Sequence, residues 1–214
     1  GVVFTDAHSS SSVSTPSRYG VLTGRYNWRS DLKSGVLMGY NKALIAPDRR
    51  TIASVLRDQG YQTACIGKWH LGWDWNNIEA GPDSVDFSKP ISNGPTTRGF
   101  DYFYGIIASL DMAPYVYVEN DMPTALPDRV TVNDGMKYWR KGPTASDFDH
   151  EQTLPNFINR AVDYIHDKSK EDKPFYLYLP LPAPHTPILP IKEYQGKSGL
   201  NPYGDFVLMV DDMV

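Results

Sequence analysis

The chain has 214 residues, a formal net charge of −4 at pH 7 and a hydrophobic content of 41%. This length supports one sizeable core or two small domains. The acidic balance, without runs of Lys or Arg, argues against a nucleic-acid binder, and no apolar stretch is long enough to span a membrane. The single cysteine, Cys65, excludes an internal disulfide framework and leaves the cellular compartment open.

The N-terminal part of the chain is predicted to alternate strands and helices. We expect a strand at residues 2–4, a helix over 16–22, a second helix over 48–59 and a strand over 61–66. The second helix has a possible apolar face and a glycine stop, marked by Ile52, Val55, Leu56 and Gly60.

The middle of the chain, residues 73–150, is rich in Pro, Gly, Asn and Asp and reads as mostly irregular. It is too long for a passive connection, so we interpret it as a substrate-facing insertion or a partly ordered subdomain. A helix over 153–167 and a buried strand over 175–179 are expected to follow. Alternating elements of this kind predict an α/β fold with a parallel-rich sheet, which binds ligands at the carboxyl ends of its strands.

The run Ser14-Thr15-Pro16-Ser17-Arg18 places a small hydroxyl residue at the start of a predicted helix. Backbone N–H groups and the helix dipole favour an anion there. Arg18, one turn later, can return over that end and bind an oxyanion, so the run suits a sulfate or phosphate ester. The alternative interpretation of Ser14 is an ordinary helix cap.

Three further basic side chains follow predicted strands. Lys68 and His70 are two residues apart and would share one face of an extended segment. His185 lies between Pro184 and Pro187, which restrict its backbone. Each could instead be a solvated or structural loop residue.

Four sequence blocks, in this order, resemble the formylglycine-dependent sulfatase family, as found in bacterial carbohydrate sulfatases. They are Ser14–Arg18 with Thr23-Gly24-Arg25, Gly60–Ala64 with Gly67–Gly72, Gly99–Gly105, and Pro174–Leu179 with Pro184–Pro187. The resemblance implies the alkaline-phosphatase-like α/β fold, with a mostly parallel central sheet flanked by helices. Residues 1–214 would be a segment of its larger N-terminal catalytic domain.

The resemblance also implies roles for the motif residues. Residue 14 would be oxidised to formylglycine by a formylglycine-generating or anaerobic maturation enzyme, and would then act as nucleophile and calcium ligand. Arg18 and Lys68 would neutralise the ester oxygens, His70 would accept a proton, and His185 would protonate the leaving group. The family usually has Cys where this chain has Ser14. Either the serine is natural, or it replaces a cysteine and leaves the chain inactive.

Some family segments are not found in this chain. The resemblance implies a preceding pair of metal-binding Asp residues, a following Asp-Asn or Asp-His pair with a Lys, and a C-terminal subdomain. Asp211 and Asp212 lie after His185 in the chain, so we interpret them as structural. We expect the sequence to be an excerpt of a longer protein; the alternative is a chain without its metal site.

The function implied by the resemblance is calcium-dependent hydrolysis of a sulfate ester on a carbohydrate, in the periplasm or another extracytoplasmic space. Aromatic rings beside polar groups suit sugars, which makes Trp73, Asp74, Trp75 and Tyr115 candidate substrate contacts. Segments 111–115 and 138–140 could add others. A phosphodiester or phosphonate hydrolase of the same superfamily and a non-catalytic glycan-binding relative remain alternatives.

Overall fold

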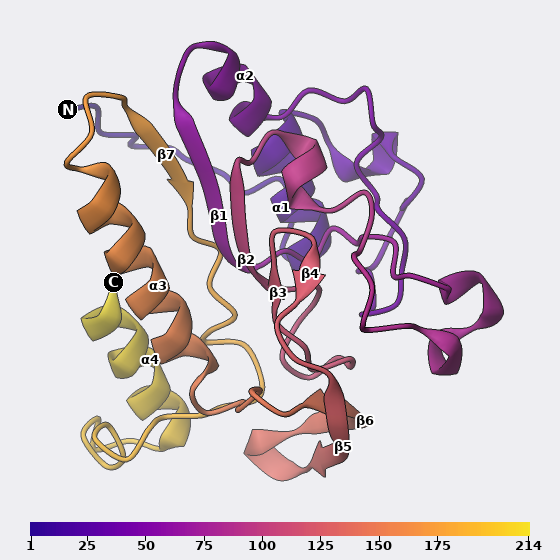
Figure 1. Cartoon of the computed structure of the whole chain (residues 1–214). Helices are drawn as coiled ribbons and strands as arrows, with labels where there is room; N and C mark the ends of the chain where they lie inside the picture. Colours follow the sequence, from indigo (N-terminus) through magenta and orange to yellow (C-terminus); the bar gives the residue numbers. More distant parts are fainter.

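The computed structural model describes all 214 residues and is built around one five-stranded sheet with strand order β4-β3-β2-β1-β7 (Figure 1). β1 pairs in parallel with β2 and β7, whereas β3 and β4 extend the β2 edge with antiparallel pairs. The strands are β1 (Gln62–Lys68), β2 (Tyr102–Ile106), β3 (Val118–Glu119), β4 (Met122–Pro123) and β7 (Phe175–Tyr178). The predicted α/β class is confirmed, with a mixed sheet in place of a mostly parallel one.

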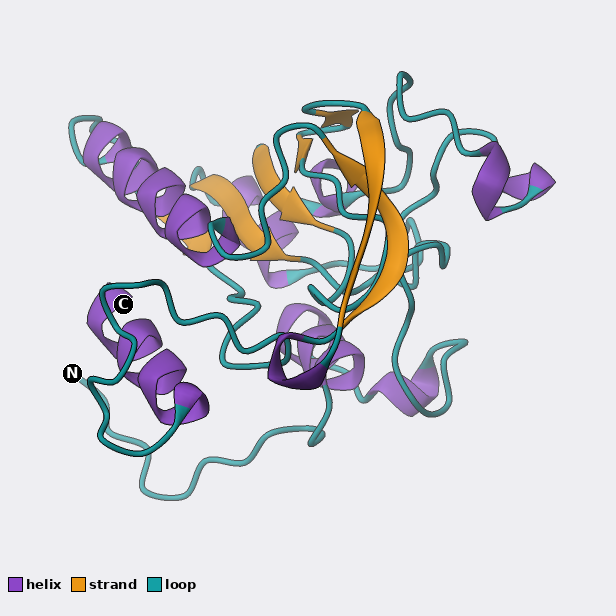
Figure 2. Cartoon of the chain, turned by 90° about the horizontal axis from the view of Figure 1, so that it is seen from below, coloured by secondary structure: helices purple, strands orange, loops and turns teal.

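Four α-helices accompany the sheet: α1 (Ser14–Thr23), α2 (Ile52–Asp58), α3 (Thr153–Lys168) and α4 (Pro202–Met213). Figure 2 places α3 on one side of the central strands and α1 on the other. Five single turns of 3-10 helix lie in the loops: η1 (Asn27–Arg29), η2 (Ile78–Ala80), η3 (Pro82–Ser84), η4 (Pro95–Arg98) and η5 (Gly135–Lys137). No helix combines the length and the apolar character that crossing a membrane requires.

The main core surrounds β1, whose last six residues are all buried. A central parallel strand is covered on both faces, which explains its continuous run of small and apolar residues. A second, smaller core connects α4 to the start of α3 and to the loop after β7. Its members are Leu154, Ile188, Leu189, Phe206 and Met209.

Two of the predicted elements differ at the N-terminal side. Residues 2–4 form no strand, and the side chains of Val2, Val3 and Phe4 are exposed. A strand is held by hydrogen bonds to a neighbouring strand, and no segment of this chain lies beside these residues in that way.

The second helix is shorter than the predicted span of 48–59. It begins at Ile52, because a capping box between Thr51 and Ser54 satisfies the first free backbone groups. The predicted apolar face is wrong: Ile52 and Val55 are exposed, and Ala53 is the buried residue of this helix.

Residues 73–150 are mostly irregular, as predicted, and contain no α-helix, but the prediction missed their strands. This span contains β2, which lies beside β1 in the centre of the sheet, with Cys65 opposite Phe103. It also contains an antiparallel hairpin of β5 (Pro127–Asn133) and β6 (Trp139–Ala145). β2 was missed because it is only five residues long and lies between turn-rich segments, where periodicity carries little signal.

The remaining predicted elements are confirmed with adjusted ends. The strand predicted over 61–66 extends to Lys68, and the helix predicted over 153–167 is α3, which buries Leu154, Phe157 and Ala161. The helix predicted over 16–22 begins two residues earlier, at Ser14. β7 is half-buried where a buried strand was expected, because it forms the edge of the sheet.

His150 gives the fold a dependence on pH. Its ring stacks on Trp139 with centroids 3.9 Å apart and is 6% exposed. Burial, followed by the charge of Arg129, lowers the pKa of His150 to about 3. The unfolded chain therefore binds a proton that the folded chain does not between pH 6.5 and 3, and stability must fall as the pH falls through that window.

We expect His150→Phe to reduce the slope of unfolding free energy against pH in this window by about 1.4 kcal/mol per pH unit. Urea unfolding at a series of pH values measures that slope. His166→Phe is the matched control, because His166 is exposed at the end of α3. An unchanged slope in the His150 variant would contradict the expectation.

Candidate active site

Ser14 is the first residue of α1, and Val13 precedes it as the N-cap. The Ser14 hydroxyl accepts a hydrogen bond from Arg18 Nε at 2.7 Å and lies 2.8 Å from His70 Nδ1. It makes no hydrogen bond to the backbone N–H groups of the helix. The side chain is therefore held between two basic groups, and the helix-cap alternative does not describe it.

The Arg18 guanidinium connects three segments of the chain. Besides Ser14, it donates from Nη1 to the Lys68 carbonyl at 2.6 Å and from Nη2 to the Leu181 carbonyl at 3.3 Å. Burial lowers the pKa of Arg18 from its ordinary value, but a guanidinium remains charged at neutral pH. Arg18 thus brings a fixed positive charge to Ser14 while joining α1 to β1 and to the loop after β7.

The second neighbour of Ser14 is a neutral imidazole. His70 Nε2 lies 2.7 Å from the Leu37 carbonyl, which can only accept, so Nε2 carries the proton. Nδ1 is then free to accept a hydrogen bond from the Ser14 hydroxyl. Burial and, after it, the charge of Lys68 lower the pKa of His70 to about 3, which keeps the ring neutral.

A backbone turn at His70 directs this ring towards α1. His70 has a positive φ of 54°, a conformation that costs free energy in a residue with a side chain. Its backbone is fixed on both sides: the His70 N–H donates to the Ile107 carbonyl at 2.7 Å, and the His70 carbonyl accepts from Thr15 Oγ1 at 2.9 Å. Thr15, which sequence reasoning did not single out, therefore ties the position of His70 to the start of α1.

Lys68 and His185 are linked through a third residue, Ser109. Lys68 Nζ donates to Ser109 Oγ at 3.0 Å, and His185 Nδ1 lies 3.1 Å from the same oxygen. Lys68 is almost fully buried, and burial, with a smaller effect from Arg18 and an opposing one from Asp111, lowers its pKa to about 7. His185 is exposed, so this end of the group is open to solvent.

The topology explains why these residues meet. Lys68 ends β1, Ser109 follows β2 and His185 follows β7, so all three lie at the carboxyl ends of parallel strands. The structure thereby brings together every predicted catalytic residue. Ser109 was missed because β2 was missed. We call the following residues the active-site cluster: Ser14, Arg18, Lys68, His70, Ser109 and His185.

The predicted sugar contacts lie elsewhere. Trp73, Trp75 and Tyr115 are 1%, 3% and 1% exposed within the main core, where they offer no surface to a sugar, so these assignments are corrected. Asp74 is half-buried and its carboxylate already accepts from the Ala43 N–H at 3.2 Å and from Asn93 Nδ2 at 2.7 Å. Aromatic residues beside polar ones did not identify a sugar-binding site, because such residues are equally common in protein cores.

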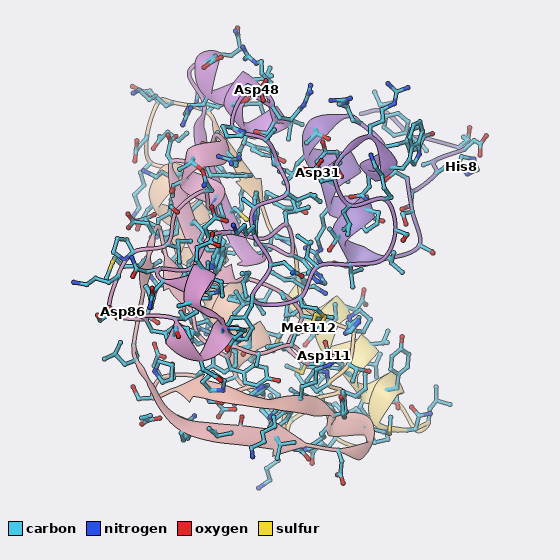
Figure 3. The ribbon with its side chains drawn as sticks, turned by 90° about the vertical axis from the view of Figure 1, so that its right-hand side faces the viewer. His8, Asp31, Asp48, Asp86, Asp111 and Met112 are labelled. Carbon is cyan, nitrogen blue, oxygen red and sulfur yellow. The ribbon has the colours of Figure 1, made fainter.

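The residues of this chain do not by themselves fit a calcium ion. Calcium takes about six to eight oxygen ligands, several of them carboxylates. No three His, Cys, Asp or Glu residues are grouped so that they could hold a metal. Figure 3 shows Asp31, Asp48, Asp86 and Asp111 on separate parts of the molecule. The partners of Ser14 are Arg18 and His70, neither of which supplies an oxygen ligand.

A general family model for sulfatases matches residues 1–214. The chain belongs to the sulfatase family. Among curated relatives, this chain is 34% identical to an N-acetylgalactosamine-6-O-sulfatase of Bacteroides thetaiotaomicron, over 99% of this chain and 46% of that protein. It is 31% identical to arylsulfatase A of Bos taurus, over 100% of this chain and 40% of that protein.

Solved structures agree with this assignment. A Bacteroides thetaiotaomicron sulfatase, described in connection with the metabolism of multiple glycosaminoglycans, superposes with a TM-score of 0.83 at 31% identity, covering 100% of this chain and 50% of that one. A Pseudoalteromonas sulfatase gives a TM-score of 0.64 at 23% identity, covering 93% and 40%, which supports the alkaline-phosphatase-like fold. This sulfatase chain thus spans about half the length of the relatives it matches.

Proposed function

We propose that this sulfatase hydrolyses a sulfate ester on a carbohydrate, with residue 14 as the nucleophile. The observation that carries the proposal is the position of Ser14 Oγ, 2.7 Å from Arg18 Nε and 2.8 Å from His70 Nδ1. A hydroxyl is a weak nucleophile unless a neighbouring group activates it. Here a neutral imidazole is placed to accept its proton, and a guanidinium is placed to hold its oxygen.

The other members of the active-site cluster have matching roles. Arg18 and, in its protonated form, Lys68 supply positive charge where the non-bridging sulfate oxygens would lie. His185, exposed and linked to Lys68 through Ser109, is placed to donate a proton to the departing sugar oxygen. When a maturation enzyme has oxidised it to formylglycine and water has added to the aldehyde, residue 14 would supply two hydroxyls on one carbon, one to attack sulfur and one to help expel sulfate.

The relatives support the proposed substrate class, whereas the proposed location rests on the family resemblance alone. A relative named N-acetylgalactosamine-6-O-sulfatase supports a sulfated amino sugar as substrate. Periplasmic or other extracytoplasmic action and a calcium requirement belong to the proposal as family expectations. The calcium ligands would have to include residues beyond the active-site cluster.

The first test is the mass of the peptide that contains residue 14, from the full-length protein purified from its native host. We expect this peptide to have lost two hydrogens relative to serine, together with sulfate release from 6-O-sulfated N-acetylgalactosamine. A native cysteine or its aldehyde would identify Ser14 as a replacement and this form as inactive. An unmodified serine from that host, without sulfate release, would overturn the proposal.

Two alternatives have specific support. The paired cations Arg18 and Lys68 would also accept a phosphate ester, and faster turnover of a matched phosphate ester than of the sulfate ester would favour a phosphodiester or phosphonate hydrolase. Ser14 in place of the usual cysteine would suit a glycan-binding relative that does no catalysis. That alternative predicts saturable glycan binding but no sulfate release, even from Ser14→Cys produced with the maturation enzyme.

A further inference from the structure

The β5–β6 hairpin is hydrogen-bonded to two loops of the active-site cluster. One loop carries Ser109, and the other carries the solvent-exposed His185. The Arg140 backbone N–H, on β6, donates to the carbonyl of Asp111 at 3.1 Å, and Asp111 follows Ser109 by two residues. At a second contact, the N–H of Ile188, three residues after His185, donates to the Met136 carbonyl between β5 and β6 at 2.8 Å. The hairpin is therefore fixed beside Ser109 and His185, although its sequence lies between them and belongs to neither loop.

The side chains at this junction form an ion pair that is incompletely satisfied. Arg140 Nη1 donates to Asp111 Oδ2 and, at 3.1 Å, to the Asp111 carbonyl, and Tyr115 OH donates to the Arg140 carbonyl at 2.6 Å. Asp111 Oδ1 is buried and has no hydrogen-bond partner. A buried carboxylate oxygen without a partner is unfavourable, and a hydrogen-bond donor on a ligand would satisfy it.

Arg140 supplies the complementary groups. Its side chain is 43% exposed, whereas that of Asp111 is only 9% exposed. Its Nε and Nη2 make no hydrogen bond within the protein, and the exposed ring of Tyr138 lies 5.6 Å from its guanidinium. The junction thus presents free donors at the surface and one free acceptor just beneath them.

We propose that the Asp111–Arg140 pair binds hydroxyl groups of the sugar that carries the scissile sulfate, and so selects the sugar. This inference rests on the proposed function. A hydroxyl both donates and accepts, which matches the free acceptor of Asp111 and the free donors of Arg140. The Asp111–Arg140 pair has no net charge, so it suits neutral hydroxyls better than a carboxylate or a second sulfate.

The turn between Ser109 and Asp111 places this pair next to the proposed sulfate site. The Met112 N–H donates to the Ser109 carbonyl at 2.9 Å, which closes the turn, and Figure 3 shows Asp111 above the β5–β6 hairpin. Ser109 contacts both Lys68 and His185. A sugar with its sulfate at Lys68 and its bridging oxygen at His185 therefore has its ring beside Asp111 and Arg140.

The test compares Arg140→Ala and Asp111→Asn with the unsubstituted full-length enzyme on two substrates, 6-O-sulfated N-acetylgalactosamine and 4-nitrophenyl sulfate. The loss of hydrogen bonds to charged groups is expected to lower the ratio of kcat/KM for the sugar to kcat/KM for the aryl ester by about 10–100-fold. Lys141→Ala is the matched control, because the neighbouring residue on β6 points to the opposite face of the strand. Its ratio should be unchanged.

Equal losses on both substrates, or no loss on either, would overturn the inference and leave the ion pair a structural feature. Binding of the sulfated sugar, followed by calorimetry, separates this inference from the proposed function because it requires no turnover. If the unsubstituted enzyme releases no sulfate but Arg140→Ala still weakens sugar binding about 10-fold, the proposed function fails and the sugar-binding role stands. Unchanged binding in both variants would refute that role.

Discussion

Arg18→Lys should lower kcat/KM for the sulfated sugar by about 100-fold or more while leaving the protein folded. Arg18 uses three different nitrogens to reach Ser14, the Lys68 carbonyl and the Leu181 carbonyl. A lysine ammonium is a single point on a flexible stem and cannot make these three bonds in the same directions. Lysine retains the positive charge, so the loss of kcat/KM would report the hydrogen-bond geometry of the guanidinium and not simply the presence of a cation.

Steady-state kinetics on the full-length enzyme measure this effect, with circular dichroism as the check on folding. Arg57→Lys is the matched control, since Arg57 is an exposed residue of α2 that makes no hydrogen bond to the active-site cluster. We expect it to retain full activity. Less than about a threefold loss for Arg18→Lys would argue that Arg18 has only a structural role at the end of α1.

Gly72→Ala should lower the free energy of unfolding by more than about 3 kcal/mol. Gly72 has a φ of +71°, and a Cβ atom on it would lie 2.0 Å from the Lys42 carbonyl oxygen. The Lys42 backbone cannot move aside as a flexible side chain could, so the segment after His70 would have to move. That segment is also held by the bond from Trp69 Nε1 to the Gly72 carbonyl at 2.9 Å.

Gly199→Ala separates the two contributions to this effect. Gly199 has nearly the same φ, +68°, but a Cβ atom on it would meet no other atom within 4 Å, so this variant reports backbone strain alone. We expect this control to lower the unfolding free energy by about 1–2 kcal/mol, measured like the first variant by urea unfolding. If the two variants were equally destabilised, the close approach of Lys42 to Gly72 would have no energetic importance.

The local part of the candidate site could be predicted from sequence. Ser14 and Arg18 are four residues apart on one helix, and this spacing alone brings their side chains together. The strand leading to Lys68 and the helix over 153–167 were also predictable, because the periodic pattern of their own residues indicates each element.

Residues that reach the site from distant segments were predictable only where a family motif marks them. Ser109 joins the active-site cluster only because β2 lies beside β1, and β2 is too short to give a periodic signal. Trp73, Trp75 and Tyr115 have the composition expected of a sugar site, yet tertiary packing buries them in the main core. Side-chain type does not reveal which face of a loop will be covered by another segment.

The family, the α/β class and the basic residues around Ser14 can be recognised in the amino-acid sequence, because they depend on short motifs and on spacing along one element. Three other features come from tertiary packing: His70 is neutral, Ser109 links Lys68 to His185, and Arg140 reaches Asp111. Each of these depends on burial or on contact between segments far apart in the chain. Such contacts arise from the packing of the whole sheet and its loops, which no local pattern encodes.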